Sequence, residues 1–397
     1  MENPKIRFKG FTKDWEQRKF GEVVEKYEDP VETPTEGYMR LGIRSHAKGT
    51  FHNYVEKGKE LETAKMFRVA ADKFIVNITF GWEHAVAITD KNDAGKLVSH
   101  RFPQYSFNEG MIPKFFRYLI LDESFKHHLE LSSPGGAGRN RVLKLNEMLE
   151  YKMSFPSEEE QKKIASYFEK LDHLITLHQR KCDQTKNLKK YMLQKMFPQN
   201  GAKVPEIRFD GYTYDWEQRK LGDIGSTFTG LSGKTKEDFG HGDAQFITYM
   251  NVFSNPVANL EMTEAVEIDA KQNCVKKGDV FFTTSSETPE EVGMSCVMPE
   301  NKDNIYLNSF CFGYRPTEKF DLDYLAYVLR ADSFRQEMTF LAQGISRYNI
   351  SKNKVMEVSI PIPNLEEQTM VGQYFSNLDH LITLHQRQHK LHLNMLL

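Results

Sequence analysis

Two stretches of the chain repeat apolar residues at alternating steps of four and three positions, which is the pattern of a heptad seam. The residues that form it are Ile164, Phe168, Leu171 and Ile175 in the first stretch and Val371, Phe375, Leu378 and Ile382 in the second. Each stretch follows a residue suited to cap a helix, Ser157 or Asn364, and the carboxylate of Glu160 can complete a capping box. The pattern predicts long helices within residues 156–204 and 363–397.

The first helix can run to about Phe197, because Pro198 cannot continue it. A helix of roughly 40 residues is about 60 Å long, at about 1.5 Å per residue. A helix of this kind cannot bury its apolar stripe alone. Its partner could be its own globular neighbour, but two equal helices of a repeat can also pair antiparallel around a pseudo-two-fold axis.

We expect the antiparallel pair, with His178 and His385 on the seam, where they can face each other. The residues expected at this helix-pair or partner interface are Ile164, Phe168, Leu171, Ile175, His178, Val371, Phe375, Leu378, Ile382 and His385. His385, His389 and His392 have i, i+4, i+7 spacing. Since the first helix has no matching group, we interpret this spacing as accidental, and the seam histidines as polar seam residues and not metal ligands.

Outside these helices, short β-like runs are broken by Gly, Pro and Asn, and helical runs are expected at 114–131 and 321–343. The sequence therefore predicts mixed modules at residues 1–155 and 205–362. The expected fold class is α+β: two mixed α/β domains joined by two long antiparallel coiled-coil helices, as a pseudo-two-fold tandem repeat.

An internal repeat supports this division. Residues 4–22 and 205–223 are identical at 13 of 19 positions, and the segment LDHLITLHQR occurs at 171–180 and again at 378–387. Between the shared blocks the sequences of the two halves diverge, although Ala71–Ile75 occupies the position in the first half that Gly278–Phe282 occupies in the second. A shared frame around different surfaces favours two modules that do the same job on different targets.

Composition and charge narrow the possibilities. The chain has no run of 18 apolar residues and no apolar signal region at its start, so we expect a cytoplasmic protein. Residues 1–204 carry 35 Lys and Arg against 28 Asp and Glu (+7), and residues 205–397 carry 18 against 27 (−9). A protein that held DNA by charge alone would be basic throughout. Any DNA binding must therefore use local patches or a partner's basic surface.

The sequence offers no catalytic motif. It contains no Walker A loop, no G-x-S-x-G, no H-E-x-x-H and no Asn/Asp-Pro-Pro-aromatic tetrad. Glu160-Gln161-Lys162 imitates a fragment of a nuclease site, but its place in the first turn of a long helix favours capping. The four cysteines include no C-x-x-C pair, which argues against zinc. We expect no metal site and no cofactor of the chain's own.

Several polar, glycine-containing loops are candidates for DNA contact, because glycine allows close approach and Arg and Asn can recognise G and A bidentately. For any one loop, ordinary surface is an equally good interpretation. The candidate DNA-binding residues are Arg44, His46, Lys48, Arg139, Asn140, Arg141, Ser232, Lys234, Lys236, Asn251, Ser285, Ser286, Ser346, Arg347, Tyr348 and Asn349.

The order of these blocks resembles the specificity subunit of type I restriction–modification enzymes over essentially the whole chain. The residues that carry the resemblance are Asp-Trp-Glu-Gln-Arg-Lys-[Phe/Leu]-Gly at the opening of each module and Pro-x-x-x-Glu-Gln at each helix start. The resemblance implies that residues 1–155 and 205–362 are target-recognition domains, each recognising one half of a split DNA site. It implies that the helices at 156–204 and 363–397 set the spacing between the half-sites.

The resemblance also implies partners. Two methyltransferase subunits with S-adenosylmethionine would dock on the chain, and ATP-dependent restriction subunits that use ATP and Mg would join them. Methylation, ATP hydrolysis and cleavage would then belong to those partners, and this chain would not be an enzyme. Two alternatives remain open from the sequence: a tandem scaffold that binds only protein, and an enzyme with its own methylation or cleavage site.

Overall fold

A computed structural model describes residues 4–61, 63, 65–135, 141–199 and 201–396 of the protein. They form two compact units, one of residues 1–174 with 393–397 and one of residues 175–392. The boundary at 174/175 falls inside the long helix α4 (Glu158–Lys195), so this helix begins in the first unit and ends in the second.

Each unit contains a four-stranded antiparallel sheet with the same arrangement of strands. In the first unit the order is β2 (Val24–Tyr27), β10 (Gln104–Phe107), β7 (Lys73–Val76) and β8 (Val86–Ile88). In the second it is β13 (Gly225–Thr229), β20 (Cys311–Pro316), β16 (Val280–Thr283) and β18 (Ser295–Val297). Strands β7 and β16 hold equivalent positions, which confirms the match between the segments at 71–75 and 278–282.

The repeated block at the start of each module clamps the strand that leads into the module's own long helix. Strand β1 (Glu16–Lys19) pairs antiparallel with β11 (Lys152–Phe155), and β12 (Glu217–Lys220) pairs in the same way with β22 (Ser359–Ile362). The sequence is EQRK in both β1 and β12. Identical sequence therefore builds identical structure at both helix starts.

A further sheet in each unit carries the divergent sequence. The first unit has the order β3 (Pro30–Glu32), β6 (Lys65–Arg68), β9 (Leu97–Val98), β4 (Tyr38–Ile43) and β5 (Thr50–Val55). The second has β15 (Thr263–Val266), β14 (Phe239–Ile247) and β19 (Ile305–Leu307), with a separate pair, β17 (Ser285–Ser286) and β21 (Tyr348–Asn349). Each of the two larger sheets contains a parallel pair, β4 with β9 and β14 with β19, so the mixed modules are confirmed.

Each expected module helix is divided into two shorter helices. In the first unit these are α1 (Pro113–Leu119) and α2 (Glu123–Leu131), followed by α3 (Leu145–Leu149). In the second they are α6 (Leu322–Val328) and α7 (Asp332–Leu341), with α5 (Tyr249–Ser254) and α8 (Lys352–Met356) on either side in the chain. Asp122 ends the run after α1, because its side chain accepts hydrogen bonds from the amides of Ser124 and Phe125 and so caps α2. The 3₁₀ turns are η1 (Phe20–Glu22), η2 (Gly81–Glu83), η3 (Leu221–Asp223), η4 (Lys236–Asp238) and η5 (Pro289–Glu291).

The first turns of the long helices pack on their own modules, contrary to our expectation that the whole seam joins the two helices. Ile164 lies against the core of the first module, and the ring of Phe168 lies 4.7 Å from that of Tyr118 in α1. Val371 and Phe375 belong to the core of the second module. The reason is the short connection: β11 ends at Phe155 and α4 begins at Glu158, and β22 ends at Ile362 and α9 begins at Leu365. Each strand therefore holds the first turns of its helix against its own module.

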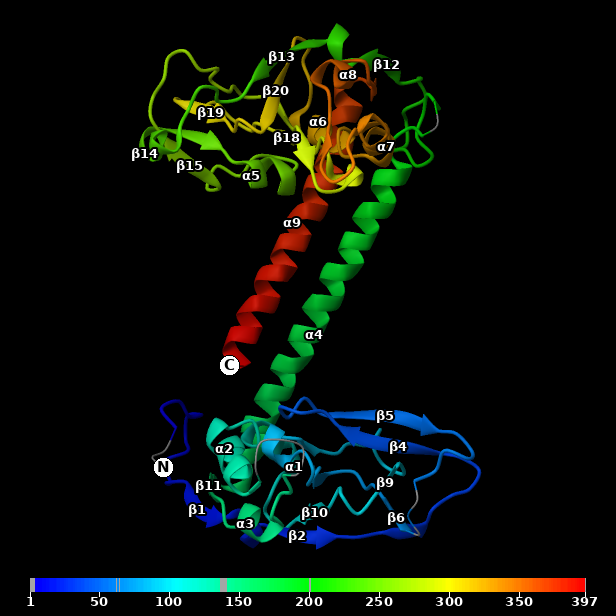
Figure 1. The fold of residues 1–397 in the computed structure, drawn as a ribbon, viewed down its shortest axis with the longest axis vertical. Coiled ribbons are helices and arrows are strands. Elements are labelled where there is room, and N and C mark those ends of the chain that lie inside the picture. The colour runs from blue at the N-terminus through cyan, green and yellow to red at the C-terminus, as the bar shows by residue number, and fades with distance from the viewer. Residues whose placement is uncertain (1–3, 62, 64, 136–140, 200, 397) are drawn as a thin grey trace. The chain divides into compact units, whose positions relative to one another are not determined.

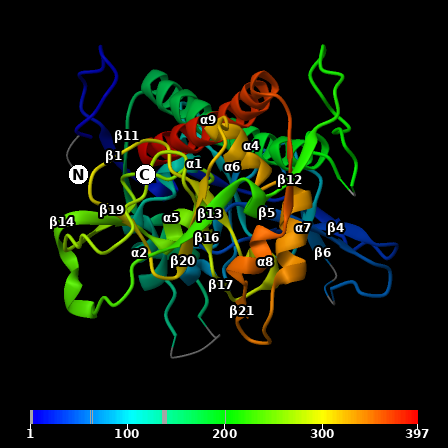
Figure 2. The ribbon, with the colours of Figure 1, turned by 90° about the horizontal axis from the view of Figure 1, so that it is seen from above.

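The antiparallel pair is confirmed further along, within the second unit (Figures 1 and 2). There α9 (Leu365–Leu396) contacts the last turns of α4. The ammonium of Lys189 lies 2.6 Å from the carboxylate of Asp379, and the ring of Phe197 lies 5.7 Å from that of Phe375. Residue numbers rise along α4 while those of their partners fall along α9, as an antiparallel pair requires.

Candidate nucleic-acid interface

The two modules share the same arrangement of loops at the ends of the equivalent strands β7 and β16. The loop before α3 is joined to the segment after β7 by a backbone hydrogen bond from Leu143 N to Ile78 O, 2.9 Å long. The loop before α8 is joined to the segment after β16 by the corresponding bond from Ile350 N to Thr284 O, 3.0 Å long. In each module two sequence-distant loops are therefore held together at the same edge.

Each of these edges carries an arginine from the loop before the short helix. In the first module the guanidinium of Arg141 lies over the ring of Trp82, 5.3 Å from its centroid. In the second, Nη2 of Arg347 donates to Oγ of Ser285 at 3.1 Å. Both arginines were candidates from the sequence, and the structure places each against the segment that follows the central strand. The residues that support them differ, so the two edges present different surfaces.

In the second module this edge borders a cleft of about 410 Å³. Its lining residues are Tyr249, Met250, Phe253, Ser285, Ser286, Glu287, Glu291, Ser346 and Arg347. The rings of Tyr249 and Phe253 are stacked, with centroids 6.0 Å apart. Burial raises the pKa of the Tyr249 hydroxyl, which donates to Ser285 O at 2.7 Å. The cleft thus combines stacked aromatic rings, one cation, two carboxylates and hydroxyls.

The first module has a cleft of about 460 Å³ beside its own edge. Arg40 and Arg101 line it together with Asn77, Thr79 and Glu83, and Arg101 donates to Oγ1 of Thr79 at 3.1 Å. Neither arginine was a candidate from the sequence, because neither stands in a glycine-containing loop. Arg40 is a half-buried residue within β4, a strand whose other residues are buried except Met39, so no surface pattern marks it in the sequence.

The predicted loop at 44–48 borders this cleft. The hydroxyl of Ser45 donates to Glu83 at 2.5 Å, and the backbone amide of His46 donates to Glu83 O. His46 adopts a left-handed φ of 62°, and the guanidinium of Arg44 lies over the ring of Phe51. The side chains of Arg44, His46 and Lys48 are exposed.

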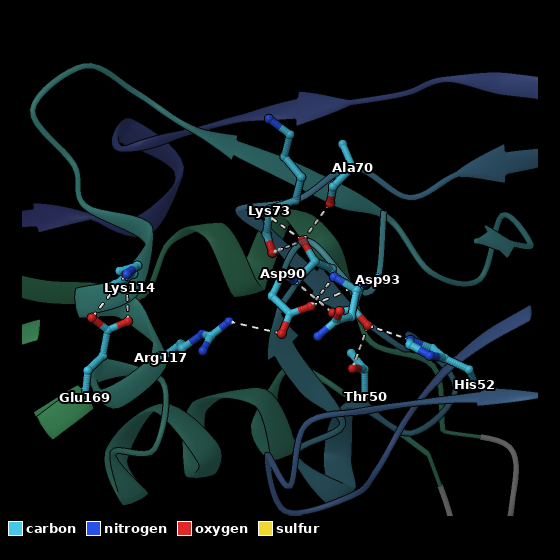
Figure 3. A network of polar contacts seen from close by, with 11 residues as sticks. Thr50, His52, Ala70, Lys73, Asp90, Asp93, Lys114, Arg117 and Glu169 are labelled. Carbon is cyan, nitrogen blue, oxygen red and sulfur yellow. Dashed lines mark hydrogen bonds and ion pairs between the residues drawn. The ribbon is translucent and has the colours of Figure 1, made fainter. Parts of the chain in front are cut away.

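A buried aspartate fixes the neighbouring hairpin in the first module (Figure 3). Asp93, which is 3% exposed, accepts hydrogen bonds from Oγ1 of Thr50 and Nε2 of His52, both at 2.8 Å. It also accepts from the amide of Asp90 at 2.9 Å. These bonds tie β5 to the turn at 90–93 and hold the strand that follows the Arg44 loop.

Several candidate residues do not stand as expected. Asn251 is wrong as a DNA contact: it is fully buried, and its side-chain amide donates to the carbonyls of Asn259 and Met262. It was selected because Asn recognises adenine, but here that side chain satisfies the backbone of a turn. Ser285 and Ser286 are 5% and 9% exposed; Ser285 accepts from Arg347 and Ser286 donates to Glu291. They are placed to orient charged neighbours.

The loop at 232–236 is largely engaged with its own module. The ammonium of Lys234 lies 3.2 Å from Asp269, whose pKa is lowered to about 2 by the Lys271 amide and further by Gln272 and Lys234. The backbone of Ser232 exchanges two hydrogen bonds with the Gln272 side chain. Lys236, Ser346, Arg347 and Asn349 are exposed, and Tyr348 is half-buried. Arg139 and Asn140 lie outside the described residues.

The repeated helix starts bind charged partners within each module. Arg7 donates to both carboxylate oxygens of Glu160 at 2.9 and 2.7 Å, and Arg208 does the same to Glu367 at 2.7 and 2.9 Å. Ser157 caps the helix as expected, but the Glu160 carboxylate serves this ion pair and not the expected capping box. The Glu160-Gln161-Lys162 fragment is therefore structural.

The histidines of the helix pair meet as expected and gather one more. The Nδ1 atoms of His178 and His385 are 3.2 Å apart, and the ring of His392 stacks on His178 with centroids 5.4 Å apart. His392 therefore packs against the seam beside His178, a contact that the sequence did not predict. Within the described part of the chain, no three His, Cys, Asp or Glu side chains are arranged to hold a metal ion. In that same part, no helix is long and apolar enough to cross a membrane.

Comparisons with known proteins agree on one family. The family described as "Type I restriction modification DNA specificity domain" matches residues 12–187 and again 214–394. Over 251 residues, or 60% of the chain, it is 25% identical to the type I restriction enzyme MjaVIII specificity subunit of Methanocaldococcus jannaschii. That match spans 57% of the relative, so the chain spans little more than half of its length.

Two solved structures share the fold. The HsdS subunit from Thermoanaerobacter tengcongensis has a TM-score of 0.51 and 19% identity, with 96% of this chain and 95% of that chain covered. A type I restriction–modification S subunit from M. genitalium has a TM-score of 0.54 and 12% identity, with 99% and 96% covered. The predicted tandem of mixed modules and long helices is therefore confirmed at the level of the fold.

Proposed function

The chain belongs to the type I restriction modification DNA specificity family, and from that premise we propose that it is a DNA-reading subunit without catalysis of its own. Each module recognises one half of a bipartite DNA site. The observation that carries this proposal is that the equivalent sheets of the two modules each present an arginine at the same edge. Arg141 lies against Trp82 in the first module, and Arg347 contacts Ser285 in the second.

The difference between the two edges supports two different half-sites. An arginine can bind guanine bidentately in the major groove or hold a phosphate. Arg141 lies on an aromatic face, whereas Arg347 is oriented by a hydroxyl beside a cleft that contains Glu287 and Glu291. A carboxylate can accept a hydrogen bond from N4 of cytosine, and an arginine can donate to guanine. The second cleft, with Glu287, Glu291 and Arg347, therefore suits a G·C base pair. A shared frame with different side chains gives each module its own preference.

The long helices set the distance between the half-sites in this proposal. Helix α4 has 38 residues, which corresponds to about 57 Å at about 1.5 Å per residue. The ion pair of Lys189 with Asp379 fixes the register of α4 against α9 in the second unit. A fixed register is what a spacer between two DNA-reading modules needs.

The proposal assigns methyl transfer and cleavage to partners. Leu381, Leu384 and Leu391 follow one face of α9 and are 42%, 41% and 52% exposed, so that face offers apolar surface to partner helices. Two methyltransferase subunits that bring S-adenosylmethionine would dock on the helices and modules, and restriction subunits with ATP and Mg would join them. The net charge of −9 on residues 205–397 fits a chain that binds DNA together with a basic partner.

A methylation map of the host genome, with and without this gene, tests the proposal. We expect deletion of the gene to remove adenine methylation from one bipartite motif, and its return to restore that motif. An unchanged map would contradict the proposal. A scaffold that binds only protein would also leave the reconstituted methyltransferase complex without salt-dependent affinity for any duplex.

A further inference from the structure

The loop before α8 in the second module presents an isoleucine at its tip. Ile345 is 96% exposed, the highest value among the large apolar side chains of the described residues. Two reciprocal backbone hydrogen bonds between Gln343 and Asn349, both 2.9 Å long, close the base of the loop. A closed loop that projects an apolar side chain into solvent is an unusual use of isoleucine.

The backbone of this loop is well determined by its neighbours. Gly344 has a φ of 150°, which side-chain-bearing residues rarely adopt, and a Cβ there would lie 2.1 Å from Arg347 O. Strand β21 pairs with β17 through Tyr348 and Asn349, directly after the tip. The hydrogen bond from Arg347 to Ser285 adds a side-chain tie. The position of Ile345 is therefore fixed by contacts on both sides of it.

The surroundings of Ile345 match a nucleic-acid surface better than a protein-docking patch. Arg347 stands two residues away and lines the cleft with Tyr249 and Met250, of which Met250 is 54% exposed. A single apolar tip beside a cation is too small for a stable protein interface, which buries about 800 Å² on each partner. Proteins that deform DNA insert apolar side chains such as Ile between base steps while neighbouring cations hold the backbone.

We propose that Ile345 is a wedge that inserts between two base pairs of the second half-site and bends the duplex there, with Arg347 beside it on a base or a phosphate. This inference rests on the proposed DNA-reading function and names a residue that reads DNA by deformation. Pyrimidine–purine steps unstack most easily, so the wedge favours such a step at its point of entry. The corresponding loop of the first module lies partly outside the described residues, and the inference concerns the second module alone.

The test uses the full chain reconstituted with its methyltransferase subunits and a 40-base-pair duplex that carries the mapped methylation motif. Donor and acceptor dyes at the two ends report bending through energy transfer, and titration of the complex gives affinity. The variants are Ile345→Ala, which removes the wedge, and Ile345→Met, which keeps an apolar side chain. Phe340→Ala is the matched control, because Phe340 is 84% exposed in the same module but lies on α7.

We expect the wild-type complex and Ile345→Met to bend the duplex alike, with affinities within about threefold of each other. Ile345→Ala should lose most of the bend and about tenfold in affinity, while Phe340→Ala should change neither. Equal bending and affinity for wild type and Ile345→Ala would overturn the wedge. So would a loss of methyltransferase assembly in Ile345→Ala, which would assign Ile345 to a protein contact. A wild-type complex without preference for the motif would instead overturn the DNA-reading function itself.

Discussion

The Nδ1 atoms of His178 and His385 face each other across the helix pair at 3.2 Å. At this distance one ring nitrogen donates a proton and the other accepts it, so the pair holds one proton between these atoms and not two. Burial lowers the pKa of His178, and the nearby His385, His392, Lys181 and His389 lower it further. The neutral form of His178 is therefore the one that the folded helix pair favours.

This geometry predicts a pH dependence of stability. Because the pKa of His178 in the folded protein lies below its unfolded value of about 6.5, its contribution is complete above pH 6.5 and is lost as the pH falls below that value. We expect the urea midpoint to fall between pH 7.5 and pH 5, and His178→Gln to flatten that fall. His380→Gln is the control, because His380 is exposed. Parallel pH profiles for wild type and His178→Gln would contradict this reading of the pair.

The repeated Arg–Glu pairs predict equivalent destabilisation in the two modules. The Glu367 carboxylate is 1% exposed and accepts from both Arg208 and Trp216. Glu367→Gln leaves the Arg208 charge without its partner and should cost about 3 kcal/mol of unfolding free energy. Glu160→Gln should have a similar effect through Arg7. Glu366→Gln is the control, because Glu366 is adjacent and exposed. We expect it to change the free energy of unfolding, measured by urea denaturation, by no more than about 0.5 kcal/mol.

Periodicity was enough to predict the two long helices, because a heptad seam that follows a capping residue, Ser157 or Asn364, and occurs twice has few alternatives. It could not say which part of the seam packs on a module, because Ile164 and Ile175 look alike along the chain. The ion pair of Arg7 with Glu160 joins residues 153 positions apart, and no local pattern reports it. Residue type alone misplaced Asn251, since an amide that can recognise adenine can equally satisfy a turn.

Arg347 offers a direct test of DNA contact in the second module. If Arg347 binds a base, Arg347→Ala should weaken binding of the methyltransferase complex to its motif by about 1–3 kcal/mol and relax one position of the second half-site. If it binds a phosphate, affinity should fall evenly across sequences and the salt slope should drop by about one. Titrations at two salt concentrations separate these outcomes. Lys354→Ala, at an exposed position of α8, is the control, and unchanged affinity and slope for Arg347→Ala would exclude a DNA contact.

If α4 sets the spacing between half-sites, as we propose, a longer α4 should change the gap between them. Four residues inserted between Leu174 and Ile175 lengthen the helix by about 6 Å, close to one turn, and leave the Lys189–Asp379 ion pair in place. We expect the gap in the methylated motif to grow by about one or two base pairs, at ~3.4 Å each. The same insertion after Gly58, in an exposed loop, should leave the gap unchanged. A constant gap with the α4 insertion would show that the helix does not set it.

A module exchange tests most directly whether two separable modules each recognise one half of a DNA site. Residues 23–155 are replaced by the equivalent segment of another family member, with β1 and α4 retained, and the methylated motif is mapped by genome-wide methylation sequencing. We expect one half of the motif to change while the other half stays the same. A motif in which both halves change, or neither does, would show that the modules do not recognise the half-sites separately.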